Sequence, residues 1–207
     1  MTWVKICGIT SFEDGLKASL LGVDALGFIF APSPRRIDPH LARKIIEGLP
    51  TPPIKIGVFV DEAKEEVLRV AKYCCLDGLQ FHGRESKEYC QKFNYFIIKA
   101  IRIQDVKSLS EMEMYPDTMI LLDSFSPNQA GGTGNPFSWD IALGLKGKRD
   151  FILSGGLTPQ NVREAIKKVK PWGVDVCSGV EASLGRKDHL KMENFIKEVK
   201  KADEDTR

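Results

Sequence analysis

The residues best suited to acid–base chemistry in this sequence come at the ends of short apolar runs. Cys7 ends the run WVKIC, and Asp123 follows MILL. A carboxyl group next to an apolar run is partly desolvated, which favours its neutral form and lets it act as a proton donor. A thiol ionises with an ordinary pKa of about 8.5 and can then serve as a base or a nucleophile. For either residue taken alone, a structural role is the simpler interpretation: packing for Cys7 and loop capping for Asp123.

Two glycine-containing turns predict a phosphate site. The segments SGG at 154–156 and CSGV at 177–180 each follow an apolar run. Backbone N–H groups at such turns, backed by a helix N-terminus, bind phosphate. Tight turning alone would explain one of them, but two at neighbouring strand ends favour a phosphate. Cys177 precedes the glycine of the second turn by two positions, and we expect it to have only a packing role. The candidate phosphate-binding residues are Gly155, Gly156, Ser178 and Gly179.

Other polar residues at the same positions could line a pocket. Arg35 and Arg36 follow PSP, and a guanidinium there could hold a substrate carboxylate through two parallel hydrogen bonds. A surface salt bridge explains a single arginine equally well. Lys5 lies on the same strand face as Cys7 and needs a carboxylate partner that the sequence does not identify. Further candidates for contact with a ligand are Gln80, His82 and Asp175.

The elements that would position these residues alternate regularly along the chain. Eight β-rich runs occupy residues 3–7, 24–30, 54–60, 77–82, 95–101, 118–124, 150–154 and 173–178. Amphipathic segments follow at 11–21, 38–48, 62–73, 85–93, 104–114, 138–144, 159–168 and 188–201. Alternation of this kind is typical of parallel sheets. Eight units of about 26 residues over 207 predict an α/β protein whose residues 1–207 form a single (β/α)8 TIM barrel. An open sheet of five or six strands is the alternative if two runs are not strands.

In a parallel barrel the carboxyl ends of the strands form the functional face, so the candidates above would share one site. Local signals support the segmentation: Thr10 or Ser11 can cap the first helix, and Thr158 with Pro159 can begin the seventh. The segment FSPNQAGGTGNPF at 125–137 is unusually long for a loop in such a barrel, which predicts a lid.

Composition narrows the classes of partner. The 30 basic and 28 acidic side chains give a net charge of +2, which argues against nucleic acid or an anionic membrane as partner. No apolar run reaches about 18 residues, and the first residues show no secretion signal. The five cysteines form no C-x-x-C pair or Cys/His cluster, so we expect free thiols, no metal site and a reducing cytoplasm. We expect a monomer or homodimer.

Eight motifs in order make the sequence resemble one enzyme family. The chain is similar to phosphoribosylanthranilate isomerase, a (β/α)8 enzyme of tryptophan biosynthesis. The motifs are KICGIT (5–10), GFIFAPSPR (27–35), GVFV (57–60), LQFHG (79–83), LLDS (121–124), GGTGNPFSW (131–139), LSGGLTPQNV (153–162) and GVDVCSGVE (173–181).

The resemblance implies a reaction and roles for residues. The reaction is the Amadori rearrangement of N-(5-phosphoribosyl)anthranilate to 1-(2-carboxyphenylamino)-1-deoxyribulose 5-phosphate, without a metal or an organic cofactor. Cys7 would be the general base and Asp123 the general acid. Arg35 would hold the anthranilate carboxylate, and the glycine turns would hold the phosphate.

Two alternatives compete with this interpretation. A related aldose–ketose isomerase of histidine biosynthesis shares the fold but carries an aspartate at the position of Cys7. A barrel that binds sugar phosphates without catalysis would have no need of both Cys7 and Asp123. An assay for the loss of phosphoribosylanthranilate tests the resemblance against both alternatives.

Overall fold

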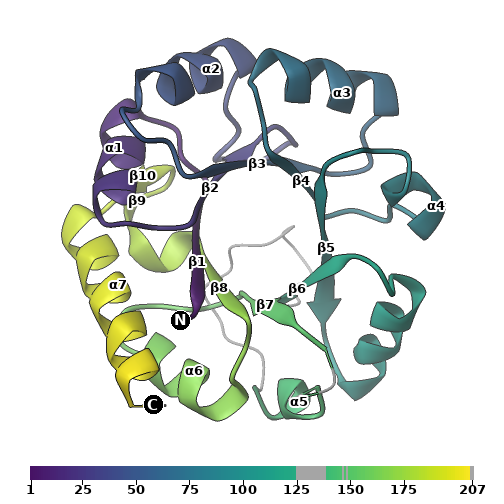
Figure 1. Cartoon of the computed structure of the whole chain (residues 1–207), viewed down its shortest axis with the longest axis vertical. Helices are drawn as coiled ribbons and strands as arrows, with labels where there is room; N and C mark the ends of the chain where they lie inside the picture. The colour runs from purple at the N-terminus through teal and green to yellow at the C-terminus, as the bar shows by residue number, and fades with distance from the viewer. Residues whose placement is uncertain (125–138, 146, 148, 206–207) are drawn as a thin grey trace.

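Eight parallel strands close into a barrel in the computed structural model, which describes residues 1–124, 139–145, 147 and 149–205 (Figure 1). Each strand pairs with the next in sequence, and β8 pairs with β1. The single (β/α)8 barrel is therefore confirmed, and the open-sheet alternative is wrong. The strands are β1 (Trp3–Cys7), β2 (Ala25–Ile29), β3 (Ile54–Phe59), β4 (Gly78–Phe81), β5 (Phe96–Ile103), β6 (Met119–Ser124), β7 (Phe151–Leu153) and β8 (Gly173–Val176).

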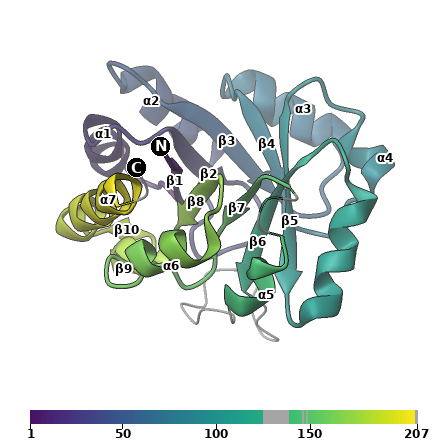
Figure 2. The same cartoon turned by 60° about the horizontal axis from the view of Figure 1, so that its bottom comes forward.

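Helices surround the barrel and cover the outer face of its strands (Figures 1 and 2). They are α1 (Phe12–Leu20), α2 (Pro39–Gly48), α3 (Lys64–Tyr73), α4 (Lys87–Cys90), α5 (Trp139–Leu143), α6 (Val162–Val169) and α7 (His189–Glu204), with the 3-10 helices η1 (Val106–Met114) and η2 (Ser178–Val180). Within the described residues, no helix has the length and apolar character needed to cross a lipid bilayer.

Side-chain alternation along each strand separates two hydrophobic regions. On β1, Val4 and Ile6 belong to the large core that also includes helix residues. Lys5 and Cys7, on the opposite face of β1, point into the barrel. The second region is a small cluster of strand residues: Ala25, Ile56, Ile98, Ala100, Leu121 and Ile152. Cys7 therefore lies at the carboxyl end of the interior layer, where functional side chains of such barrels are found.

The sequence predicted the first helix start correctly and the seventh incorrectly. The hydroxyl oxygen of Ser11 caps α1 by accepting a hydrogen bond of 3.3 Å from the backbone N–H of Asp14. The seventh helix, α6, begins at Val162 and not at Pro159. Asn161 closes the preceding turn, because its Oδ1 accepts from the N–H of Thr158 at 2.8 Å and its Nδ2 donates to a carbonyl oxygen at 2.9 Å. The backbone N–H groups of Asn161 and Val162 also donate to the carbonyl oxygen of Thr158, at 3.2 and 3.0 Å, so a turn stands directly ahead of the helix.

Two predicted helices differ from the prediction, one hairpin was not predicted, and one predicted loop is not described by the structure. The segment predicted as a helix at 104–114 is the 3-10 helix η1, and α4 is a single turn. A hairpin formed by β9 (Glu181–Ser183) and β10 (Arg186–Lys187) was not predicted, and it lies next to α7 in both views (Figures 1 and 2). The segment 125–137, expected to act as a lid, lies outside the described residues.

Candidate active site

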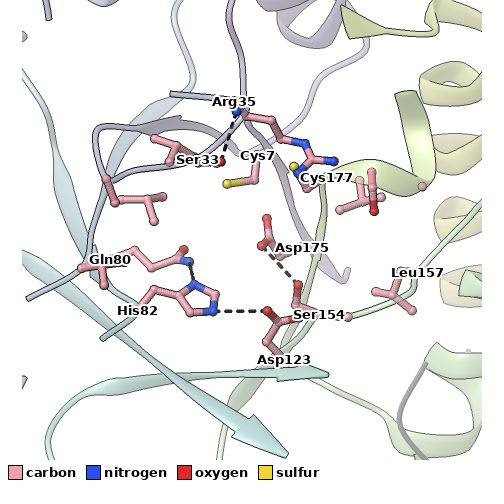
Figure 3. Close-up of a pocket in the computed structure, with 18 of the residues that line it drawn as sticks. Cys7, Ser33, Arg35, Gln80, His82, Asp123, Ser154, Leu157, Asp175 and Cys177 are labelled. Carbon is pink, nitrogen blue, oxygen red and sulfur yellow. Dashed lines mark hydrogen bonds and ion pairs between the residues drawn. The ribbon is translucent and has the colours of Figure 1, made fainter. Parts of the chain in front are cut away.

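One cavity at the carboxyl ends of the strands collects ten of the candidate residues (Figure 3). The empty space within it, including its open mouth, is about 740 Å³. The structure thus brings together residues from six strand ends, while their roles stay predictions. The candidates that line it are Cys7, Arg35, Gln80, His82, Asp123, Gly155, Gly156, Asp175, Ser178 and Gly179.

Cys7 is the last residue of β1, and a glycine on the next strand makes room for its side chain. Cys7 pairs in register with Gly27 of β2. A Cβ atom on Gly27 would lie 2.6 Å from the sulfur of Cys7, which is too close for any side chain there. Gly8 follows with a φ of +74°, a left-handed conformation that turns the chain out of the strand. The thiol is therefore held at the wall of the cavity.

The partner of Lys5 is Asp175. The fully buried Nζ of Lys5 lies 2.6 Å from Oδ1 of Asp175 on the adjacent strand β8. Burial alone would lower the pKa of Lys5, but attraction to Asp175 raises it above its ordinary value. The hydroxyl group of Ser154 donates a hydrogen bond of 3.3 Å to Oδ2 of the same carboxylate. The floor of the cavity below Cys7 thus carries a matched pair of charges.

Asp123 stands across the cavity from Cys7, in contact with His82 (Figure 3). Its Oδ1 accepts a hydrogen bond of 2.9 Å from the N–H of Ser124, and its Oδ2 lies 3.2 Å from Nε2 of His82. Nδ1 of the ring lies 3.3 Å from the amide nitrogen of Gln80. With Gln80 donating to Nδ1, the neutral imidazole carries its proton on Nε2, facing Asp123.

Two polar atoms in this group lack a hydrogen bond within the described part of the chain. They are Nε2 of His82, whose approach to the carboxylate is poorly aligned, and Oε1 of Gln80. Buried polar groups are nearly always hydrogen-bonded in folded proteins. A donor and an acceptor left in this state at the wall of a cavity favour a polar ligand.

A buried network under this wall fixes the loop that carries His82. Nζ of Lys99 donates 2.7 Å to the carbonyl oxygen of Gly83 and lies 3.1 Å from Oε2 of Glu85. The carboxylate of Glu85 also accepts from the N–H groups of Gly83 and Asp61, at 2.9 and 2.8 Å. These contacts hold Gly83, the residue directly after His82, and so restrain the position of His82.

The two glycine turns pack against each other and against β6. Gly155 and Gly156 have φ angles of +78° and +71°, which favour glycine. A Cβ atom on Gly155 would lie 2.4 Å from the backbone nitrogen of Ser124, and one on Gly179 would lie 1.8 Å from the carbonyl oxygen of Leu157. Within the described residues, the N–H groups of Gly155 and Gly156 donate no hydrogen bond. They are suited to bind an anion.

Arg35 is buried at the cavity wall, whereas Arg36 is exposed. The Arg35 guanidinium donates two hydrogen bonds to Glu181, from Nε at 2.7 Å and from Nη2 at 2.8 Å. Nζ of Lys187 lies 3.4 Å from the same carboxylate. Although burial opposes it, these cations hold the pKa of Glu181 below its ordinary value. Sequence reasoning did not single out Glu181, although the motif GVDVCSGVE ends on it.

Cys177, which was expected to pack, also lines the cavity. Its side chain interacts with that of Cys7, and its sulfur lies 3.7 Å from Nζ of Lys187. The hydrogen bond with Cys7, together with attraction to Lys187 and Arg35, outweighs burial and lowers the pKa of Cys177 to about 7. The same hydrogen bond, with burial, raises the pKa of Cys7 well above its ordinary value.

Within the described residues, no cluster of His, Cys, Asp and Glu could hold a metal ion.

Comparison with known proteins points to one enzyme family. Residues 4–198 match the model of the family described as N-(5'-phosphoribosyl)anthranilate (PRA) isomerase. A relative from Desulforudis audaxviator named N-(5'-phosphoribosyl)anthranilate isomerase is 50% identical over 98% of this chain and 100% of its own. A relative from Geotalea uraniireducens with the same name is 50% identical over 97% of this chain and 99% of its own.

Solved structures of phosphoribosyl anthranilate isomerases are also similar to this chain. The crystal structure of phosphoribosyl anthranilate isomerase from Thermotoga maritima has a TM-score of 0.91 and 43% identity, over 97% of this chain and 100% of that one. A structure of such an isomerase in complex with reduced 1-(o-carboxyphenylamino)-1-deoxyribulose 5-phosphate has a TM-score of 0.88 and 42% identity, over 97% of this chain and 100% of that one.

Proposed function

We propose that this chain, which belongs to the N-(5'-phosphoribosyl)anthranilate isomerase family, catalyses the Amadori rearrangement of tryptophan biosynthesis with Cys7 as general base and Asp123 as general acid. The observation that carries these roles is the placement of a thiol and a carboxyl group on opposite sides of one cavity (Figure 3). The substrate is N-(5'-phosphoribosyl)anthranilate, a small molecule with a phosphate at one end and a carboxylate at the other.

The phosphate binds to the glycine turns. Gly155 and Gly156 present N–H groups without hydrogen bonds in the described structure, and Gly179 packs so closely on Leu157 that a side chain is excluded. Bare backbone at this position lets a phosphate approach the N–H groups directly, and loops after strands seven and eight commonly bind phosphate in these barrels. Ser178 adds a hydroxyl group at the same turn.

The anthranilate carboxylate binds to Arg35. A guanidinium has five N–H groups, and Glu181 uses one on Nε and one on Nη2. The remaining N–H groups on Nη1 and Nη2 form the end of the fork and can hold a second carboxylate through two hydrogen bonds. Glu181 thus fixes the guanidinium plane and leaves its end for the substrate.

Between these anchors the sugar lies within reach of Asp123 and Cys7. Asp123 donates a proton to the ribose ring oxygen, and the ring opens to a protonated Schiff base. The iminium acidifies the hydrogen on the neighbouring carbon, and the Cys7 thiolate removes it to give an enolamine, which becomes the keto product. His82 and Gln80 orient the acid from behind and can meet the sugar hydroxyl groups with their unpaired polar atoms.

Isotope kinetics test the two roles separately. In Cys7→Ser the weaker base makes proton abstraction rate-limiting, so substrate deuterated at the sugar's second carbon should show a primary isotope effect. In Asp123→Asn ring opening limits the rate, and the isotope effect should be small. Each change should lower kcat by about 10²–10⁴-fold, with little change in KM. Cys75→Ser, at an exposed thiol, is the control and should behave as wild type. Near-normal turnover of Cys7→Ser would refute the mechanism.

A fluorescence assay for the loss of N-(5'-phosphoribosyl)anthranilate tests the proposed reaction against both alternatives. Neither a sugar-phosphate-binding barrel nor a histidine-pathway isomerase would consume this substrate. We further propose that the enzyme acts in the cytoplasm as a monomer or homodimer and needs no organic cofactor. Light scattering of the purified protein tests the assembly, and full activity after dialysis against a chelator tests the independence from metal.

A further inference from the structure

We infer that Lys187 is a positioning residue that makes the site selective for the substrate carboxylate: by sharing Glu181 with Arg35, it leaves a net positive charge at the guanidinium that the carboxylate meets. The inference rests on the proposed function, in which Arg35 binds the anthranilate carboxylate. The described lining of the cavity includes Arg35 but not Lys187, so Lys187 acts through its neighbours and not by contact with the substrate. The hairpin of β9 and β10 thereby takes part in substrate selection.

The hairpin places a cation directly opposite a carboxylate. Lys187 of β10 pairs in register with Glu181 of β9, and Nζ of Lys187 lies 3.4 Å from Oε1 of Glu181. Opposite charges on facing residues of two strands attract each other. The side chain of Lys187 is fully buried, so salt screens this attraction only weakly. Arg186, the residue before it on β10, is exposed.

Contacts on both sides hold Lys187 in this place. Its backbone N–H donates a hydrogen bond of 3.1 Å to Oδ2 of Asp14 on α1, and Oδ1 of Asp14 lies 3.0 Å from Nε2 of His189. Its Nζ donates a hydrogen bond of 2.9 Å to the carbonyl oxygen of Cys177, directly after β8. The ammonium group therefore stays beside Glu181 whether or not a substrate is bound.

Two cations share one carboxylate on this side of the cavity. Glu181 accepts hydrogen bonds from Nε and Nη2 of Arg35 at 2.7 and 2.8 Å, and its two cationic partners keep its pKa below the ordinary value although burial opposes this. Arg35, Glu181 and Lys187 together carry one net positive charge. A substrate carboxylate at the free end of the Arg35 fork neutralises that charge. Without Lys187, the same carboxylate would leave a surplus negative charge in a buried site, which is unfavourable.

One further ionisable group lies beside Lys187. The sulfur of Cys177 is 3.7 Å from Nζ, and a thiolate there would cancel the surplus positive charge. The pKa of Cys177 is lowered to about 7 by its hydrogen bond with Cys7 and by two nearby cations, so its thiol is mostly protonated at pH 6. Lys5 and Asp175 form a closed ion pair with no net charge. The charge balance is therefore best tested near pH 6.

The test is a calorimetric titration of the purified enzyme at pH 6 with two ligands. One is the reaction product with its ketone reduced to an alcohol, and the other is the same molecule without the carboxyl group. The ratio of the two dissociation constants measures the preference for the carboxylate. In Lys187→Met this preference should fall at least about tenfold, while the affinity for the ligand without the carboxyl group should change little. Arg186→Met removes an exposed cation from the same strand and is the matched control, which should keep the wild-type preference.

A double variant separates the effect of charge from that of structure. Lys187→Met/Glu181→Gln removes one positive and one negative charge, so Arg35 again provides one net positive charge at the site. Most of the preference for the carboxylate should therefore return. The double variant also leaves no buried carboxylate in the hairpin without a partner, which guards against a result caused by poor folding of the single variant.

The outcomes separate this inference from the function on which it rests. Equal losses of affinity for both ligands in Lys187→Met would mean that Lys187 only supports the structure, and an unchanged preference would mean that its charge has no effect on selection. Either result overturns the inference, as does a double variant that prefers the carboxylate no more than Lys187→Met does. If Arg35→Ala keeps the wild-type preference, the carboxylate does not bind at Arg35, and the proposed carboxylate site itself fails.

Discussion

Replacement of Arg35 by alanine should weaken catalysis strongly, while Arg36→Ala should leave it nearly unchanged. Arg35 is buried and its guanidinium is already held by Glu181, so under the proposed function its remaining N–H groups would meet the substrate carboxylate in a desolvated site. Truncating one partner of a buried, hydrogen-bonded charge pair costs about 2–5 kcal/mol. At about 1.4 kcal/mol for each factor of ten, kcat/KM should fall by about 30-fold to a few thousand-fold. Arg36 is exposed, and its loss should cost about twofold or less.

A substrate without the carboxylate separates binding from structural damage. Arg35→Ala also leaves Glu181 with Lys187 as its sole described ion-pair partner, which could distort the site by itself. The phosphoribosyl derivative of aniline lacks the carboxylate but keeps the phosphate and the sugar. If Arg35 binds the carboxylate, wild type and Arg35→Ala should differ by less than about tenfold on this analogue. Equal losses on both substrates, or a larger loss for Arg36→Ala, would refute the assignment.

Three further predictions concern charge and backbone. Lys5→Met should lower the free energy of unfolding by about 3–5 kcal/mol in urea titrations, because it leaves the buried carboxylate of Asp175 without its ion-pair partner. The double variant Lys5→Met/Asp175→Leu should recover much of this loss, because neither charge remains. Gly179→Ala should raise KM at least about tenfold and weaken inhibition by inorganic phosphate, because its Cβ would lie 1.8 Å from the carbonyl oxygen of Leu157. Unchanged inhibition would mean that the phosphate does not bind at that turn. The folded-state pKa of Glu181 is lowered, so its stabilisation is full above its ordinary pKa of about 4.3 and is lost as pH falls through the folded value. Between pH 6 and pH 3, the free energy of unfolding should therefore fall less for Glu181→Gln than for the wild type, as measured by denaturant titration. Equal decreases in the two proteins would contradict this.

The regular part of the fold was predictable because its signal is local. Each barrel strand is a short apolar run followed by an amphipathic segment, and the eight predicted strands overlap the eight observed ones, β1 to β8. The prediction failed where side chains decide the backbone. Asn161 closes a turn that delays α6, and the short β9–β10 hairpin has no apolar alternation to reveal it. That hairpin matters because it brings Glu181 and Lys187 to the cavity.

The candidate residues were also predictable one by one, since each stands at a strand end, but their partners were not. Lys5 and Asp175 are 170 positions apart, and Arg35 and Glu181 are 146 apart. Both pairs exist because closure of the barrel places β8 and the hairpin after it beside β1 and the end of β2. Sequence position carries no information on such contacts until the register is known. A buried lysine next to a candidate base already required a carboxylate, and closure of the barrel made Asp175 that carboxylate.

The same closure decides what surrounds Cys7. The register of β1 with β8 brings Asp175 and Cys177 to the same cavity as Cys7, and the hairpin adds Glu181 and Lys187 beside Cys177. Under the proposed function, the motif KICG therefore marks where the base stands, while many of the groups around it come from the other end of the chain.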